Sequence, residues 1–264
     1  MPRLIACAAL LITTIFPVPA VADVLDNIIK RGTIRVGVAE IAPWTLRDAN
    51  GELIGFEIDV AKKIAADMRV KADYKLYEWD DLVPALDRGE IDVIASGLTI
   101  TPAHALQVNF SRPIATSGVS IATNTARTKD IKSLRDLDRK GVAIAVVADT
   151  LSANTAKNFF DEADVVAYAS ADLAEREVVS GRAFAYVASL PEVSFLALRN
   201  ADAIDVPMNK PLVAASEGLA VKKGEQELLN FLNAWVTAHH SDRWLESTRD
   251  YWFQTMDWIQ ERQK

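Results

Sequence analysis

Residues 91–113, IDVIASGLTITPAHALQVNFSRP, decide the fold because they join a buried strand to the start of a helix. The opening residues 91–95 are mostly apolar, which is typical of a short strand in the core of a sheet. Thr101 and Pro102 are residue types preferred at an N-cap and at the first position of a helix. Free N–H groups and the helix dipole favour an anion there, so the stretch predicts a cradle for a carboxylate or a similar group.

The first 22 residues are expected to be a secretory signal peptide. Arg3 precedes an apolar run over residues 4–15, and Ala20-Val21-Ala22 forms a small-x-small cleavage site. A membrane anchor is the alternative, but two prolines cut the apolar run below spanning length. We therefore expect an exported protein located in the periplasm.

Composition excludes several classes of function. Removal of residues 1–22 takes away Cys7, the one cysteine, and Arg3, one of 29 basic residues, so the net charge changes from −7 to −8. No long basic block is present, which argues against a nucleic-acid partner. A chain without cysteine cannot use a thiolate as a nucleophile or as a metal ligand. His239 and His240 are adjacent and point in different directions on a helix, so we expect no metal and no cofactor.

Strand and helix patterns alternate in two series, which predicts parallel α/β sheets. Segments containing proline, near residues 111–118 and 205–213, separate the two series. We infer one lobe from residues 23–114 and 214–264 and a second from 115–213, with the chain crossing between them twice. Two crossings predict a hinge that closes a cleft on a small ligand. Expected helices cover 24–30, 56–68, 133–137, 151–161, 171–179, 191–198, 228–236 and 244–259, and a further helix runs through 82–86 with Asp80 or Asp81 as its cap and Gly89 at its end. Expected strands cover 33–38, 74–79, 91–95, 119–123, 142–147, 165–168, 184–189 and 219–221.

An ordered set of motifs along the whole mature chain resembles the family 3 periplasmic solute-binding proteins, the polar amino acid receptors of ABC importers. The motifs include IRVGV at 34–38, DANGELIGFEIDV at 48–60, WDDLVPAL at 79–86, GEIDVI at 89–94, TITP at 99–102, NFSRP at 109–113, LRDL at 134–137 and GLAVKKG at 218–224. The resemblance implies a two-lobe type II binding protein fold with a mainly parallel sheet in each lobe. It also implies a monomer that passes a small polar solute to an ABC permease in the inner membrane.

The resemblance also assigns candidate ligand contacts. Trp79 matches the aromatic residue that covers the ligand side chain in this family. Ser96, Gly97 and Thr99 match the polar cradle of the first lobe. Thr150 matches the contact of the second lobe at a helix N-terminus. The alternatives are core packing for Trp79 and plain helix capping for the hydroxyl residues.

Two positions depart from the family pattern. His104 stands where the family has an arginine for the α-carboxylate, and histidine lacks the permanent charge and the bidentate fork. Ser189 stands where the family has an aspartate for the α-ammonium. Glu40, in the first ligand-facing loop, could supply a carboxylate instead, and with Trp79 it could hold a cation. These changes favour a modified amino acid, an amine or another zwitterion.

Two other functions use the same fold. One is an enzyme that resembles the cyclohexadienyl dehydratases, which need a catalytic acid and an arginine that His104 replaces here. The other is an accessory or sensory module that binds a partner without transport. Trp44 is expected to pack beneath the site, and the tryptophans at 235, 244, 252 and 258 to pack in the core or against a partner.

Overall fold

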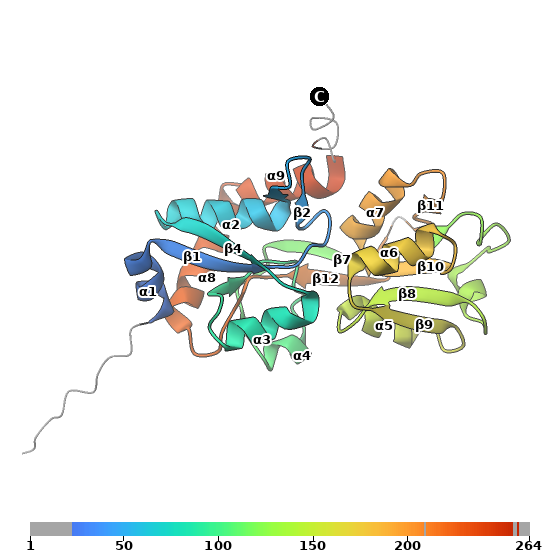
Figure 1. Ribbon diagram of the computed structural model, residues 1–264, viewed down its shortest axis with the longest axis horizontal. Coiled ribbons are helices and arrows are strands. Elements are labelled where there is room, and N and C mark those ends of the chain that lie inside the picture. The colour runs from blue at the N-terminus through green and yellow to red at the C-terminus, as the bar shows by residue number, and fades with distance from the viewer. Residues whose placement is uncertain (1–22, 209, 256–257, 259–264) are drawn as a thin grey trace, which may run out of the picture.

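The computed structural model describes residues 23–208, 210–255 and 258. The predicted signal peptide, residues 1–22, lies outside the described residues. Two α/β bodies lie side by side along the long axis of the molecule, and two long strands run between them (Figure 1). We describe the body on the left of Figure 1 as the first lobe and the body on the right as the second. Residues 214–217, which the prediction put in the first lobe, are described with the second because they pair with residues 115–118.

The first lobe is built on a five-stranded sheet with the order β4-β1-β5-β13-β6. Its strands are β1 (Thr33–Val38), β4 (Lys71–Leu76), β5 (Val93–Ile94), β6 (Asn109–Phe110) and β13 (Ala220–Val221), and a small hairpin of β2 (Leu46–Arg47) and β3 (Leu53–Ile54) stands apart. Its helices are α1 (Val24–Arg31), α2 (Phe56–Asp67), η1 (Trp79–Asp81), α3 (Leu82–Asp87), α4 (Pro102–Ala105), α8 (Gln226–Ser241), α9 (Trp244–Asp250) and η3 (Tyr251–Thr255).

The second lobe is built on a sheet with the order β11-β7-β10-β8-β9, to which β12 adds by pairing with β7. Its strands are β7 (Ala115–Asn124), β8 (Ala143–Val147), β9 (Asp164–Tyr168), β10 (Ala185–Ser189), β11 (Ile204–Asp205) and β12 (Val213–Glu217). Its helices are η2 (Leu134–Leu137), α5 (Leu151–Phe159), α6 (Ala171–Val179) and α7 (Leu190–Arg199).

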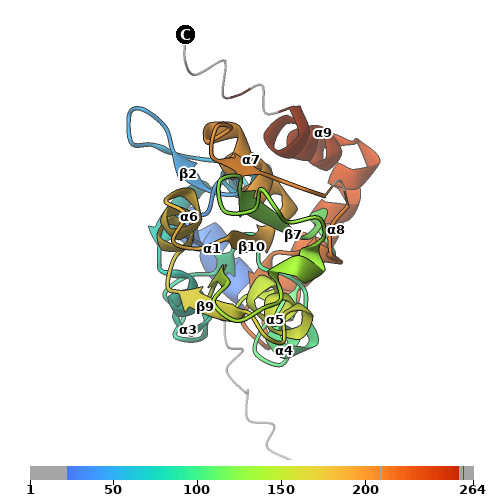
Figure 2. The same cartoon turned by 90° about the vertical axis from the view of Figure 1, so that its right-hand side faces the viewer.

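Both faces of the second sheet are covered by helices. Successive side chains of a strand point to opposite faces, and in β8 Ala145 and Val147 pack with α6 and α7, whereas Ile144 and Val146 pack with α5. Figure 2 faces this lobe and shows α5 apart from α6 and α7, with the strands between them. The continuous apolar sequence of β8 follows from this burial on two sides.

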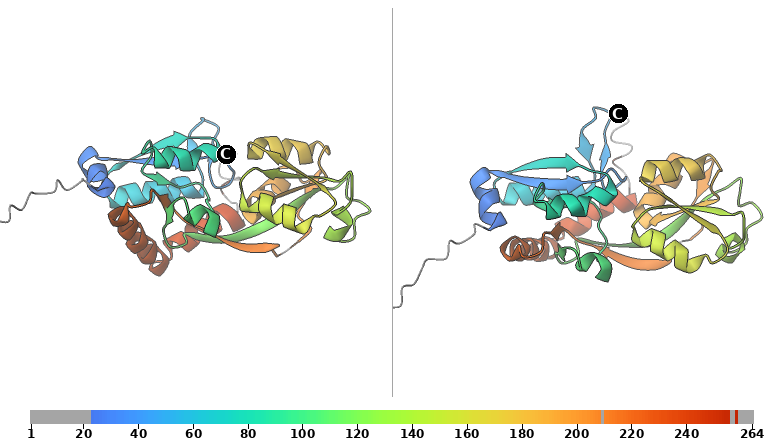
Figure 3. Two further views of the ribbon diagram at one scale, coloured as in Figure 1. Left: turned by 90° about the horizontal axis from the view of Figure 1, so that it is seen from below. Right: turned by 60° about the horizontal axis from the view of Figure 1, so that its bottom comes forward.

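The two crossing strands β7 and β12 form the connection between the lobes. They pair antiparallel from Ala115 opposite Glu217 to Val119 opposite Val213. Both views of Figure 3 show this pair passing from one body to the other. The sequence placed the second crossing near 205–213, whereas the paired strand reaches Glu217, which thereby lies at the junction of the lobes.

The sheets are mixed, which corrects the prediction of mainly parallel sheets. Pairs β1–β4, β1–β5, β8–β9 and β8–β10 are parallel, but β13 pairs antiparallel with β5 and β6, and β7 pairs antiparallel with β10, β11 and β12. The antiparallel members are the strands on either side of each crossing. The chain enters the second lobe along β7 and returns along β12, so these two paired strands run in opposite directions.

The opening stretch of the sequence has the predicted order. β5 leads into a polar loop, and Thr101 caps α4 by accepting a hydrogen bond from the N–H of His104 at 3.1 Å. The predicted strand 74–79 ends earlier, at Leu76, and Trp79 instead begins the turn η1. The tryptophans Trp235, Trp252 and Trp258 are buried in the core of the first lobe, as one of the two predicted alternatives had it.

Candidate functional site

A cavity lies between the lobes, with walls contributed by both lobes and by the crossing strands. Its volume, measured for the centre of a water molecule, is about 60 Å³. One water needs roughly 10–15 Å³ on this measure, so the cavity has room for a small solute. Seven of the eight predicted site residues line it, namely Trp79, Ser96, Gly97, Thr99, His104, Thr150 and Ser189.

The first-lobe wall is the loop that follows β5. Ser96 is held by the N–H of Ala39, which donates to its hydroxyl oxygen at 2.8 Å. The N–H of Gly97 donates to Oε1 of the buried Glu57 at 2.7 Å, so this N–H points into the protein and away from a ligand. The cradle is therefore positioned by bonds to β1 and α2, and one of its predicted donors is already engaged.

His104 lies in α4 with its ring against this wall. Its Nδ1 lies 2.8 Å from the carbonyl oxygen of Thr99. A carbonyl only accepts, so Nδ1 carries the proton, and Nε2 is the ring nitrogen left for a ligand. The neutral ring offers a ligand an acceptor at Nε2, and the protonated ring offers a donor.

The second-lobe wall begins at the N-terminus of α5. The hydroxyl of Thr150 donates to the carbonyl oxygen of Val147 at 2.8 Å and accepts from the N–H of Ala153 at 3.1 Å. Leu151 and Ser152, the first residues of α5, also line the cavity. The start of a nine-residue helix thus faces the cavity, and its dipole favours a negative group there.

Ser189 belongs to a short chain of polar contacts across the cleft. The indole Nε1 of Trp44, from the first lobe, donates to its hydroxyl oxygen at 3.1 Å. The Ser189 hydroxyl in turn lies 3.4 Å from Oε2 of Glu192, whose other oxygen accepts a hydrogen bond from the hydroxyl of Tyr186. Burial raises the pKa of Glu192 to about 8, and the bonds from Tyr186 and Ser189 oppose this rise.

A second acid lines the cavity at the end of β12. The hydroxyl of Ser117 donates to Oε1 of Glu217 at 2.5 Å. Among the described residues no hydrogen-bond partner faces Oε2 of Glu217 or Oε2 of Glu57. Burial raises the pKa of Glu217 to about 7 and that of Glu57 to about 8, and the charge of Glu217 contributes to the second rise.

Two tryptophans border the cavity in different ways. Trp44 is buried, lines the cavity and packs edge-on against Phe56 and Phe253, with ring centroids 5.8 and 4.4 Å away. Trp79 is half-buried and lines the cavity from η1. Trp44 therefore combines the predicted packing role with a place at the cavity, and Trp79 both packs against the core of the first lobe and lines the cavity.

Glu40 is the predicted site residue that the structure does not bring to the cavity. Its side chain is exposed, and its Oε2 lies 3.3 Å from Nε of Arg47. Sequence reasoning missed Glu192 and Glu217, which do line the cavity. Each is an acidic residue in a mostly apolar stretch, and Glu192 lies three residues after the altered position 189, so a single acid within an apolar stretch was the signal available.

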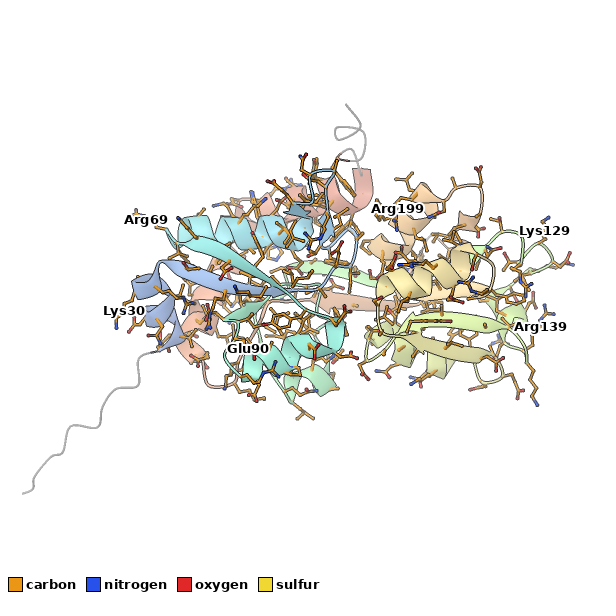
Figure 4. The ribbon with its side chains drawn as sticks, in the orientation of Figure 1. Lys30, Arg69, Glu90, Lys129, Arg139 and Arg199 are labelled. Carbon is orange, nitrogen blue, oxygen red and sulfur yellow. The ribbon has the colours of Figure 1, made fainter. Side chains whose placement is uncertain are left out.

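The cavity contains acids but no strong bases. Within the described part of the chain no lysine or arginine lines it. Figure 4 shows the labelled Lys30 and Arg69 at the outer end of the first lobe and Lys129 and Arg139 at the outer end of the second. The described residues also hold no cluster of histidine, cysteine and acidic side chains suited to a metal ion. None of the helices that could be searched in residues 23–255 is long and apolar enough to cross a membrane.

The chain is similar in sequence and in structure to known binding proteins. The chain is 26% identical to the L-cystine-binding protein TcyJ of Escherichia coli over 230 residues, which cover 87% of this chain and 85% of that one. It superposes with a TM-score of 0.80 and 35% identity on the ancestral amino acid-binding protein AncCDT-1, described as a precursor of cyclohexadienyl dehydratase, covering 88% of this chain and all of that one.

A putative ABC-transporter binding component from Wolinella succinogenes, solved in complex with lysine, also superposes with a TM-score of 0.80, at 30% identity over 87% of this chain and 99% of that one. These structures share the two-lobe type II fold with this protein. The model of the bacterial extracellular solute-binding proteins, family 3, matches residues 34–255. This protein therefore belongs to family 3 of the bacterial extracellular solute-binding proteins.

Proposed function

We propose that this protein is the periplasmic binding component of an ABC importer and that it carries an amino acid, or a close relative of one, to a permease in the inner membrane. The observation that carries the proposal is the cavity whose walls come from both lobes. Closure of two lobes about a pair of crossing strands buries a small ligand and changes the outer surface that a permease can recognise.

The walls of the cavity suit the two charged groups of an amino acid. We place the carboxylate at the N-terminus of α5, near Thr150, because the helix dipole and the N–H groups of the first turn favour an anion there. A protonated His104 would add a hydrogen bond from Nε2 on the opposite wall. We place the ammonium at Glu192, which lies 3.4 Å from Ser189 and would take over from the aspartate expected at position 189, and we assign Trp79 as the ring that covers the ligand side chain.

The names of the relatives support this ligand class. One binds L-cystine, one is an ancestral amino acid-binding protein, and one was solved with lysine. Catalysis is the weaker alternative, although the ancestral relative is described as a precursor of a dehydratase. The cavity has a buried acid in Glu192 but, among the described residues, no arginine or lysine to hold a second substrate carboxylate. The accessory or sensory alternative differs from transport only in its protein partner.

Calorimetric titration of the chain 23–264 with the standard L-amino acids tests the proposal. We expect binding of at least one amino acid, weakened about tenfold or more by Trp79→Ala, because a covering ring contributes roughly 1–2 kcal/mol. Phe159→Ala is the matched control, since Phe159 is an exposed ring on α5 outside the cavity. Absence of binding by the whole panel, or equal binding by both variants, would contradict the proposal. Cross-linking in cells that captures an ABC permease would separate transport from an accessory role.

A further inference from the structure

The cavity has one more carboxylate than an amino acid with an uncharged side chain requires. Glu192 lines it from α7 in the second lobe, and Glu217 lines it from the end of β12 at the junction of the lobes. The two acids come from different elements and have different hydrogen-bond partners, Tyr186 and Ser189 for the first and Ser117 for the second. In the proposed function Glu192 already binds the ammonium group of the ligand, so Glu217 is the additional carboxylate.

Glu217 is held as a binding group would be. Its residue is 2% exposed, and Oε2 has no hydrogen-bond partner among the described residues. A buried acceptor without a partner costs about 1–3 kcal/mol, and more if it is charged. A donor from a ligand would remove this cost, and an ammonium or guanidinium group would remove it most fully.

The backbone around Glu217 is fixed on both sides. Its carbonyl oxygen accepts from the N–H of Ile114 at 2.9 Å, and the residue is bridged to Thr99 of the cradle loop. It also pairs with Ala115 in the register of β7 and β12. The carboxylate therefore projects from a rigid position next to the cradle, which favours a specific contact with one part of the ligand.

The charge around Glu217 favours a cationic partner. It interacts with the acid Glu57, whose pKa the charge of Glu217 raises, and with the hydroxyl of Ser117, and His104 lines the same cavity. No lysine or arginine of the described chain lines the cavity to compensate the acid from within the protein. A positive charge that pairs with the ionised form of Glu217 would therefore come with the ligand.

We infer that the ligand carries two cationic groups, one held by Glu192 and a second, ammonium or guanidinium, held by Glu217 as the residue that determines specificity. The inference rests on the proposed function, because it takes the interlobe cavity as the ligand site. A basic amino acid and a diamine share this chemistry, and the titrations below distinguish them.

Matched ligands that differ only in the second charge test the inference. Lysine is compared with norleucine, and arginine with its uncharged isostere citrulline, by calorimetric titration of the chain 23–264. We expect the charged member of at least one pair to bind about tenfold or more tightly, as one charge-assisted hydrogen bond in a buried site provides. In Glu217→Gln this preference should shrink to within about threefold, while the uncharged member keeps its affinity. Glu227→Gln, an exposed position on α8, is the control of equal charge change.

Retention of the preference for the charged ligand in Glu217→Gln would overturn the inference, and so would equal binding of both members of each pair by the unmodified protein. Affinity for norleucine or citrulline shows that the variant is folded. Cadaverine, which is lysine without its carboxylate, identifies the diamine source if it binds as tightly as lysine and is weakened by the same variant. Binding of uncharged amino acids alone would refute the second cation and leave the proposed function intact. Binding of cadaverine without any amino acid would support the second cation and refute the proposed amino acid ligand, and no binding of any amino acid or of cadaverine would refute both.

Discussion

The indole nitrogen of Trp44 donates a hydrogen bond to the hydroxyl oxygen of Ser189 at 3.1 Å, and this bond joins the two lobes across the cavity. Trp44 is anchored in the first lobe by Phe56 and Phe253. Ser189 ends β10 of the second lobe and reaches Glu192 on the next helix. A residue that departs from the family pattern thus takes part in contact between the lobes.

Removal of this bond should loosen the closed arrangement. In Ser189→Ala we expect the free energy of unfolding to fall by about 1 kcal/mol, the usual contribution of one hydrogen bond. The ligand-free protein should also show a larger radius of gyration by small-angle X-ray scattering. Ser241→Ala removes an exposed serine on α8 that does not line the cavity, and serves as control. An unchanged radius together with an unchanged unfolding free energy would show that the contact does not hold the lobes.

Arginine at position 104 should bind a ligand carboxylate more tightly than histidine does. His104→Arg supplies a permanent charge and a bidentate fork, so the affinity for an α-amino acid should rise about tenfold. The affinity for cadaverine, which has no carboxylate, should not rise. Leu106→Arg adds the same charge two residues away at a side chain that is 81% exposed. Equal effects on the amino acid and on the diamine would contradict placement of the carboxylate near position 104.

Gly97 should not tolerate a side chain, for two separable reasons. Its φ of +67° is strained for other residues, and a Cβ would lie 3.0 Å from Cδ2 of Trp44. Gly97→Ala should therefore lower both stability and ligand affinity. Gly51→Ala is the matched control, because Gly51 has a φ of +81° and no atom within 4 Å of a Cβ. The control should lose only the backbone contribution, about 1 kcal/mol. Similar losses in both variants would show that contact with Trp44 is unimportant.

Stability should fall as the pH rises from about 5 to above 8. Burial raises the pKa of Glu57 from 4.5 to about 8, so the folded state binds the proton more tightly than the unfolded state. Its contribution is complete below pH 4.5 and is lost as the pH rises through about 8. Glu57→Gln, which mimics the protonated form, should flatten the profile of unfolding free energy measured by urea denaturation. A profile as steep as that of the unmodified protein would contradict a buried, protonated Glu57.

The fold could be read largely from the sequence because its signals are local. Thr101 and Pro102 start α4, and the alternation of apolar runs with helical stripes placed most strands and helices within a few residues. The antiparallel pairing of the crossing strands could not be predicted from such local signals. The pairing of β7 with β12 joins residues about 100 positions apart, and no local pattern reports it.

The site could be predicted only where a motif marks it. Ser96 and Thr150 follow the carboxyl ends of strands, which is where α/β sheets bind their ligands, and both residues line the cavity. Glu192 and Glu217 carry no motif, and their importance depends on burial and on missing partners, which are properties of the folded chain. Glu40 was predicted from its place in the sequence, but in the folded chain it pairs with Arg47 outside the cavity.

Binding of a dication should release protons near neutral pH. Burial raises the pKa of Glu217 to about 7 and that of Glu192 to about 8, so both are partly protonated in the free protein. A cation favours the ionised form, and each carboxyl must lose its proton to pair with it. Ser117 and Glu57 interact with Glu217, His104 lines the same cavity, and Tyr186, Ser189 and Glu175 on α6 interact with Glu192.

The affinity for lysine or arginine should therefore increase as the pH rises from about 6 to 8, since fewer protons remain to be displaced. Titration at one pH in buffers with different ionisation enthalpies measures the number of protons released. Glu217→Gln should lower this number, and Glu227→Gln on the exposed face of α8 should leave it unchanged. If binding takes up protons, or if the number is the same in Glu217→Gln, the second cation does not ionise Glu217. That outcome would leave Glu192 as the partner of a single ammonium group.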